Sequence, residues 1–149
     1  MSATTIKEKE AEIVEAFSWL ETWEEKYEYI IELGKNLSPL DEKFKVGENI
    51  IKGCQSTVWL VADFKDGKVI YQADSDAIIV KGLVSMLISV LTEQTPDEIL
   101  ASKLGFINEI GMMSHLAQTR SNGLVAMIKQ IKNYALAYKS LSETEKTTL

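Results

Sequence analysis

The sequence predicts an α+β fold in which two helices precede a small antiparallel sheet and several helices follow it. Apolar residues recur with helical spacing near the N-terminus, then two segments rich in β-forming residues follow, and the remaining chain returns to helical spacing. The 149 residues contain no repeats, no low-complexity tracts and no Pro/Gly/Ser linkers. We therefore expect a single domain over residues 1–149.

Two capping patterns open the N-terminal helices. Thr5-x-x-Glu8 and Thr22-x-x-Glu25 each place a hydroxyl and an acid three residues apart, at the start of an amphipathic stretch. A threonine side chain at such a position accepts a hydrogen bond from a free backbone N–H of the first turn. The segment 37–48 then loses the helical period, which predicts a connecting loop.

The middle of the chain changes to the period of a sheet. Thr57–Phe64 and Lys68–Ala73 are rich in β-branched and aromatic residues, and Asp66-Gly67 lies between them. Asp-Gly favours a tight hairpin because that turn needs positive φ. We predict a third strand over Asn49–Lys52, which gives a small three-stranded antiparallel sheet packed against helices.

Helical patterns resume after the sheet. Asp74 and Ser75 are predicted to cap a helix whose residues 78–91 are apolar on nearly every side, which is typical of a central, buried helix. Thr95-Pro96 opens a further helix, with proline at its first position.

The C-terminal third has one clear element. A long amphipathic helix is predicted from Ser121 or Asn122, and a polar tail is expected after about residue 140. The three tryptophans are expected to pack in the core; they are Trp19, Trp23 and Trp59.

Charge and hydropathy narrow the classes of partner. The net charge is −6 and no run of basic residues occurs, so nucleic acid is an unexpected partner. Residues 1–10 carry acidic side chains and lack the apolar core of a signal peptide. The most apolar stretch, residues 77–91, is too short to span a bilayer. These features predict a cytoplasmic protein without membrane contact.

The residue types that occur only once limit the kinds of functional site that the chain can form. The chain has one cysteine and one histidine, which excludes an intramolecular disulfide and falls short of a zinc or iron–sulfur ligand set. We therefore expect neither a metal site nor a bound cofactor. Gly53-Cys54-Gln55-Ser56 places the thiol on a loop or strand end, where it is either a small buried hydrophobe or a reactive group.

The sequence does not assign a single role to three other polar side chains. His115, among apolar neighbours, is interpreted as a partly buried structural residue, and a Cys54–His115 dyad for nucleophilic catalysis is the alternative. Arg120 precedes a predicted helix N-terminus, where it either favours a thiolate or lies free in solvent. Lys81 on the buried helix is expected to extend outward to water.

Several motifs occur together in a recognisable order. They are Trp23-Glu24-Glu25-Lys26-Tyr27, Asn49-x-Ile51-x-Gly53-Cys54-Gln55-Ser56-x-Val58-Trp59, Asp74-Ser75-Asp76-Ala77, His115-Leu116 and Arg120-Ser121-x-Gly123-Leu124. With them the sequence resembles the SufE/CsdE family of sulfur-acceptor proteins, which act beside cysteine desulfurases that contain pyridoxal phosphate (PLP). Family members commonly carry a Ser-Pro or Thr-Pro step before the arginine, where this chain has Ala117-Gln118-Thr119.

The resemblance implies a fold shared with IscU-type scaffold proteins. It implies that Cys54 accepts persulfide sulfur from a SufS/CsdA-type desulfurase, stimulates that enzyme and delivers the sulfur to a cluster-assembly scaffold. Gly53, Gln55, Ser56 and Arg120 would support the loop, and the PLP would belong to the desulfurase. The chain would then be an accessory sulfur-transfer protein and not a free-standing enzyme, and a homodimer is one arrangement it allows.

Two alternatives remain open at this stage. The protein could activate the desulfurase allosterically without carrying sulfur. It could instead be a cysteine hydrolase that uses Cys54 and His115, although no oxyanion-hole motif is visible.

Overall fold

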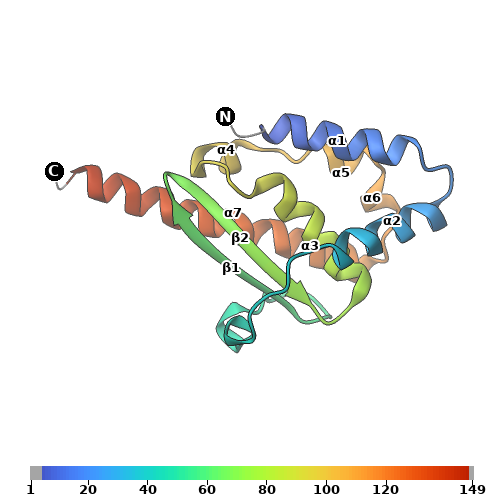
Figure 1. Cartoon of the computed structure of the whole chain (residues 1–149), viewed down its shortest axis with the longest axis horizontal. Coiled ribbons are helices and arrows are strands. Elements are labelled where there is room, and N and C mark those ends of the chain that lie inside the picture. Colours follow the sequence, from blue (N-terminus) through green and yellow to red (C-terminus); the bar gives the residue numbers. More distant parts are fainter. Residues whose placement is uncertain (1–4, 148–149) are drawn as a thin grey trace.

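The computed structural model describes the backbone of residues 5–147 and the side chains of residues 5–142. The elements in chain order are α1 (Ile6–Ser18), α2 (Trp23–Lys35), the 3-10 turns η1 (Glu42–Phe44) and η2 (Gly47–Asn49), β1 (Val58–Lys65), β2 (Lys68–Ser75), α3 (Ile78–Leu91), α4 (Pro96–Ala101), α5 (Phe106–Glu109), α6 (Met112–His115) and α7 (Gln118–Thr147). Figure 1 shows the β1–β2 hairpin lying beside α3 and α7, with α1 and α2 on the far side of α3. The mixed helix-and-sheet class is therefore confirmed.

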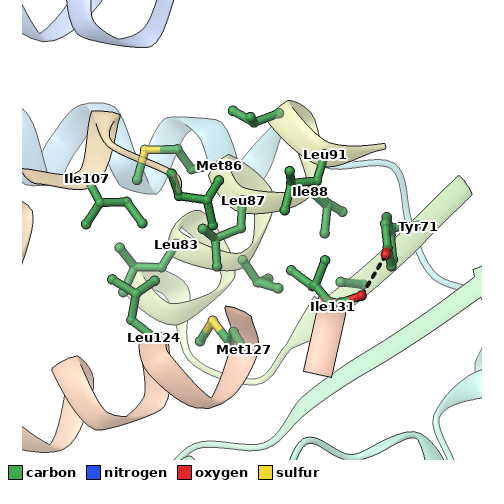
Figure 2. Packing of buried hydrophobic residues seen from close by; sticks show 14 of the residues in the cluster. Tyr71, Leu83, Met86, Leu87, Ile88, Leu91, Ile107, Leu124, Met127 and Ile131 are labelled. Carbon is green, nitrogen blue, oxygen red and sulfur yellow. Dashed lines mark hydrogen bonds between the residues drawn. The ribbon is translucent and has the colours of Figure 1, made fainter. Parts of the chain in front are cut away.

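Helix α3 is the centre of the molecule. It packs against α1, α2, α7 and β2. Ten of its fourteen residues are buried, which confirms the prediction of a central helix. Figure 2 shows its side chains meeting those of α5, α7 and β2, and the labelled residues of α3 are Leu83, Met86, Leu87, Ile88 and Leu91.

Two glycines allow α2 and α3 to cross closely. A Cβ built on Gly34 would lie 2.8 Å from the backbone nitrogen of Gly82, and one built on Gly82 would overlap the carbonyl oxygen of Ile30. Real Cβ atoms do not tolerate such approaches, so larger residues here would force the helices apart. The crossing fixes α3, and α3 supplies one wall of the site described below.

The hairpin has the turn that the sequence predicts. β1 and β2 pair antiparallel from Val58↔Ser75 to Lys65↔Lys68. Asp66 and Gly67 have φ of 53° and 78°, the positive values that a two-residue hairpin turn requires.

The predicted third strand is wrong. Within the described residues the sheet has two strands, and the segment 49–52 contributes a single bridge between Ile50 and Trp59. η2 occupies the chain up to Asn49, and Gly53, with φ of +98°, turns it away immediately afterwards. Too few extended residues remain between these two features to form a ladder.

The helix starts were predicted with mixed success. Thr5, Thr22 and Thr95 each accept a hydrogen bond from the N–H three residues on, as the capping patterns predict. The predicted cap by Asp74 and Ser75 is wrong, because β2 continues through both residues and α3 begins at Ile78 without a side-chain cap.

Helix α7 departs from its predicted limits at both ends. It begins at Gln118, several residues earlier than predicted, and continues to Thr147 through the segment expected as a polar tail.

Among residues 5–147, no helix combines the length and apolar character that a membrane span requires. Trp19 also contradicts the core prediction, since 78% of its surface is exposed just after α1.

Tyrosine hydroxyls attach α7 to the hairpin. Tyr71 of β2 donates to the Ile131 carbonyl over 2.7 Å, the bond drawn in Figure 2. Two hydroxyls of α7 donate to carbonyls of β1: Tyr134 to Leu60 over 3.3 Å and Tyr138 to Ala62 over 3.0 Å. These bonds hold α7 beside the strand that follows the cysteine loop.

Candidate functional site

Cys54 lies on the loop between η2 and β1, and hydrogen bonds fix both ends of that loop. At the entry, the Ile51 N–H donates to the Val58 carbonyl over 2.9 Å. At the exit, the Thr57 N–H donates to a carboxylate oxygen of Asp76 over 3.1 Å. Residues 52–56 therefore span two fixed points.

Two glycines let this loop lie directly on α7. Gly53 has a positive φ, and a Cβ added to it would come within 3.2 Å of the Ala126 Cβ. Gly123 faces the cysteine, and a Cβ there would lie 3.5 Å from the Cys54 sulfur. Gly123 received no role from the sequence; an isolated glycine inside a helical pattern, which usually has a packing reason, is the signal that could have marked it.

The surroundings of the Cys54 thiol favour its neutral form. Its S–H donates to the Gly123 carbonyl over 3.6 Å, and a backbone carbonyl oxygen would repel a thiolate. Partial burial raises the pKa of the Cys54 thiol, because a charged sulfur loses hydration there. The thiolate is the nucleophilic form of cysteine, so in this position the thiol is in a resting, less reactive state.

A cavity of about 250 Å³ adjoins the thiol between α3 and α7. Its apolar wall consists of Val80, Leu83 and Met127, none of which the sequence analysis singled out. Its polar lining includes Gln55, Ser56, Thr119 and Arg120. The structure thus brings Cys54 together with the predicted supporting residues Gln55, Ser56 and Arg120, while Gly53 packs on α7 beside them.

Arg120 occupies a different place from the predicted one. It lies inside the first turn of α7, where its N–H donates to the Ala117 carbonyl over 2.9 Å. Its side chain is exposed and lines the Cys54 cavity. A permanently charged side chain therefore shares this cavity with the sulfur.

His115 is not part of this cavity. Its ring is exposed and stacks on Trp23, with ring centroids 3.9 Å apart and an interplanar angle of 18°. Its Nδ1 lies 3.1 Å from the Gly111 carbonyl oxygen. The expectation of partial burial is wrong, the structural interpretation holds through the stack, and the residue does not pair with Cys54.

Lys81 ends on a carboxylate instead of extending freely to water. Its ammonium lies 3.3 Å from Asp74, which Lys45 approaches to 3.1 Å. Burial would raise the pKa of Asp74, but the Ser75 N–H and these two lysines outweigh burial and hold that pKa below its usual value. This network joins the segment before η2 to β2 and α3, and Asp74 lies two residues before Asp76, which fixes the exit of the cysteine loop.

Comparison with known proteins places these features in a family. The SufE family, described as an Fe-S metabolism associated domain, matches residues 11–135. An uncharacterized SufE-like protein of Rhizobium meliloti is 39% identical over 129 residues, covering 83% of this chain and 92% of the relative. Another from Synechocystis is 39% identical over 139 residues, covering 93% and 87%.

The fold also occurs in a solved structure. The solution structure of a hypothetical protein from Thermus thermophilus superposes with a TM-score of 0.72, over 90% of this chain and 96% of that one. Its sequence identity is 23%, so this likeness supports the architecture alone.

Alkylation kinetics test the resting state of the thiol. Because burial raises the pKa of Cys54, the rate of its reaction with iodoacetamide should rise with pH around a midpoint above that of the urea-unfolded chain. The chain has one cysteine, so mass spectrometry reports this thiol alone. A folded-state midpoint at or below the unfolded one would contradict the resting state.

Proposed function

The chain belongs to the SufE family, which associates it with Fe-S metabolism, and from this premise we propose that Cys54 carries sulfur between proteins. Cys54 accepts a sulfane sulfur from a PLP-dependent cysteine desulfurase and delivers it to a cluster-assembly scaffold. Removal of sulfur from the desulfurase stimulates that enzyme. The supporting observation is the place of the chain's one cysteine, on a loop fixed at both ends and beside a cavity.

The transfer is an exchange between sulfur atoms. The Cys54 thiolate attacks the outer sulfur of the desulfurase persulfide, and a new S–S bond forms as the old one breaks. The desulfurase thiolate leaves with the bonding electrons and takes up a proton. The sulfur oxidation states are exchanged between the two cysteines, so no additional oxidant or reductant takes part.

The resting geometry requires the loop to move before transfer. A thiolate is disfavoured beside the Gly123 carbonyl, so ionisation favours a position in which Cys54 has left α7. Gly53 can act as the hinge, because its positive φ is open to glycine and strained for other residues. Binding of the desulfurase would select the outward state, while the inward state shields the sulfur from free thiols.

Arg120 is proposed to stabilise the charged sulfur. It combines an exposed guanidinium with a place in the lining of the Cys54 cavity. A nearby cation lowers the free energy of a thiolate or persulfide anion relative to the neutral form. The proposed setting is the cytoplasm, whose reducing conditions keep a lone thiol free.

The hydrolase alternative loses support from the position of His115. A cysteine hydrolase needs a base within hydrogen-bond reach of its thiol. The His115 ring instead stacks on Trp23, away from the lining of the Cys54 cavity.

Sulfur loading tests the carrier proposal and separates it from simple activation. After incubation with a cysteine desulfurase and cysteine, the protein should gain the mass of one sulfur atom, whereas Cys54→Ser should gain none. Intact-protein mass spectrometry under non-reducing conditions measures this. Sulfur on the serine variant, or none on the wild type, would contradict carriage by Cys54. Full stimulation of the desulfurase by that variant would favour activation without carriage.

Replacing Arg120 tests its electrostatic role. Arg120→Ala should slow sulfur transfer roughly tenfold, a loss of about 1.4 kcal/mol in the transition state. Thermal stability should stay unchanged, because the side chain is exposed. Lys129→Ala removes an exposed cation elsewhere on α7 and is the matched control. Equal rates for both variants would remove Arg120 from the mechanism.

A further inference from the structure

A second hollow lies apart from the cysteine. An open groove of about 1030 Å³ runs between α1 and the segment from α4 to α5, and it shares no lining residue with the Cys54 cavity. In Figure 1, α1, α4 and α5 gather along the upper side of the molecule, whereas the chain enters β1 at the lower side. An occupant of this groove would leave the cysteine loop accessible.

One face of α1 forms a full wall of the groove. The lining residues of this helix are Ile6, Lys7, Glu10, Ala11, Val14, Glu15 and Ser18. Their spacing of three and four residues places them in one stripe along the helix. Since α1 has 13 residues, the wall is about 20 Å long.

The floor of the groove is apolar. Half-buried Val14 and exposed Ala11 and Ala101 supply its accessible apolar surface, and the lining residues Ile6 and Leu104 are almost fully buried. A long apolar channel beside a helix is the surface that receives an amphipathic helix in helix-in-groove recognition.

The rim of the groove is acidic. Four glutamates line it against two lysines, and they are Glu10, Glu15, Glu98 and Glu109. Two of these carboxylates also accept hydrogen bonds within the fold, Glu10 from the Phe106 N–H and Glu98 from Thr95, and they keep their negative charge. Exposed Glu8 and Glu12 lie on the same helix and add further negative charge. Charge complementarity therefore favours an occupant that carries lysine or arginine beside its apolar face.

An exposed tryptophan stands at one end. Trp19 follows Ser18, the last groove residue of α1, and it is 78% exposed. Tryptophan is enriched among the residues that dominate binding energy at protein interfaces. It is therefore the next residue in the chain after the end of this wall, and it is open to a partner.

We propose that this groove binds a basic amphipathic helix of a partner protein. The apolar side chains of that helix fill the channel beside Val14 and Leu104, its cations face the glutamates, and it contacts Trp19. A second copy of this chain is disfavoured as the occupant, because the chain carries a net charge of −6. The proposal does not depend on sulfur chemistry at Cys54.

A designed peptide is the probe. It contains only leucine and lysine, has the roughly 13-residue length of the wall, and repeats leucine at i, i+3, i+4 and i+7. Binding is measured by fluorescence anisotropy of the labelled peptide. Tryptophan emission should change on binding in the wild type, and Trp19→Phe should remove most of that change.

Two matched variants locate the binding. Ala11→Arg places a cation in the groove and should weaken binding by at least about tenfold. Ala137→Arg makes the same substitution on the exposed face of α7 and should stay within about twofold of wild type. Cys54→Ser should bind as tightly as wild type, which separates this result from the outcome of the sulfur-transfer experiments.

Several outcomes would overturn the proposal. Unchanged binding by Ala11→Arg would place the peptide elsewhere, and equal weakening by Ala137→Arg would mean that net charge alone drives binding. Equal affinity for a shuffled peptide of the same composition would remove the need for an amphipathic helix. A dimer in sedimentation velocity that Ala11→Arg dissociates would assign the groove to a second copy.

Discussion

The account of Cys54 depends on how the two ends of its loop are held. The entry is fixed where Ile51 bonds to the first residue of β1, and the exit is fixed where Thr57 bonds to Asp76 before α3. Only residues 52–56 lie between these points. Such a loop can expose or withdraw one side chain without altering the sheet or the helices, and a sulfur carrier needs that freedom at a single atom.

The helices that form the walls of the cysteine cavity are rigid, whereas the cysteine loop can move. α3 is buried on nearly every side, and its crossing with α2 at Gly34 and Gly82 leaves no space for larger residues. α7 is held against the hairpin by hydrogen bonds of three tyrosines. Because close-packed interiors resist continuous deformation, motion is expected to concentrate in the loop and leave the cavity in place.

Local signals predicted local structure, and long-range contacts account for the errors. Asp66-Gly67 specifies its own turn, so the hairpin followed from the sequence. The strand over Asn49–Lys52 failed because partner strands and neighbouring turns decide whether a short apolar segment joins a sheet. Asp74 failed as a cap because β2 continues through it, and its carboxylate binds Lys45 and Lys81. The family motifs indicated the cysteine and its supporting residues, but the role of the Gly123 carbonyl depends on tertiary packing.

The passage of sulfur through Cys54 is the central claim, and a pulse–chase experiment tests it most directly. Radiolabelled cysteine is supplied to the desulfurase in the presence of this protein, and a scaffold protein is added after the excess label is removed. We expect the label on the peptide that contains Cys54, followed by its loss from that peptide as it appears on the scaffold. Label that never reaches Cys54, or that reaches the scaffold equally well with the Cys54→Ser protein, would contradict the carrier function.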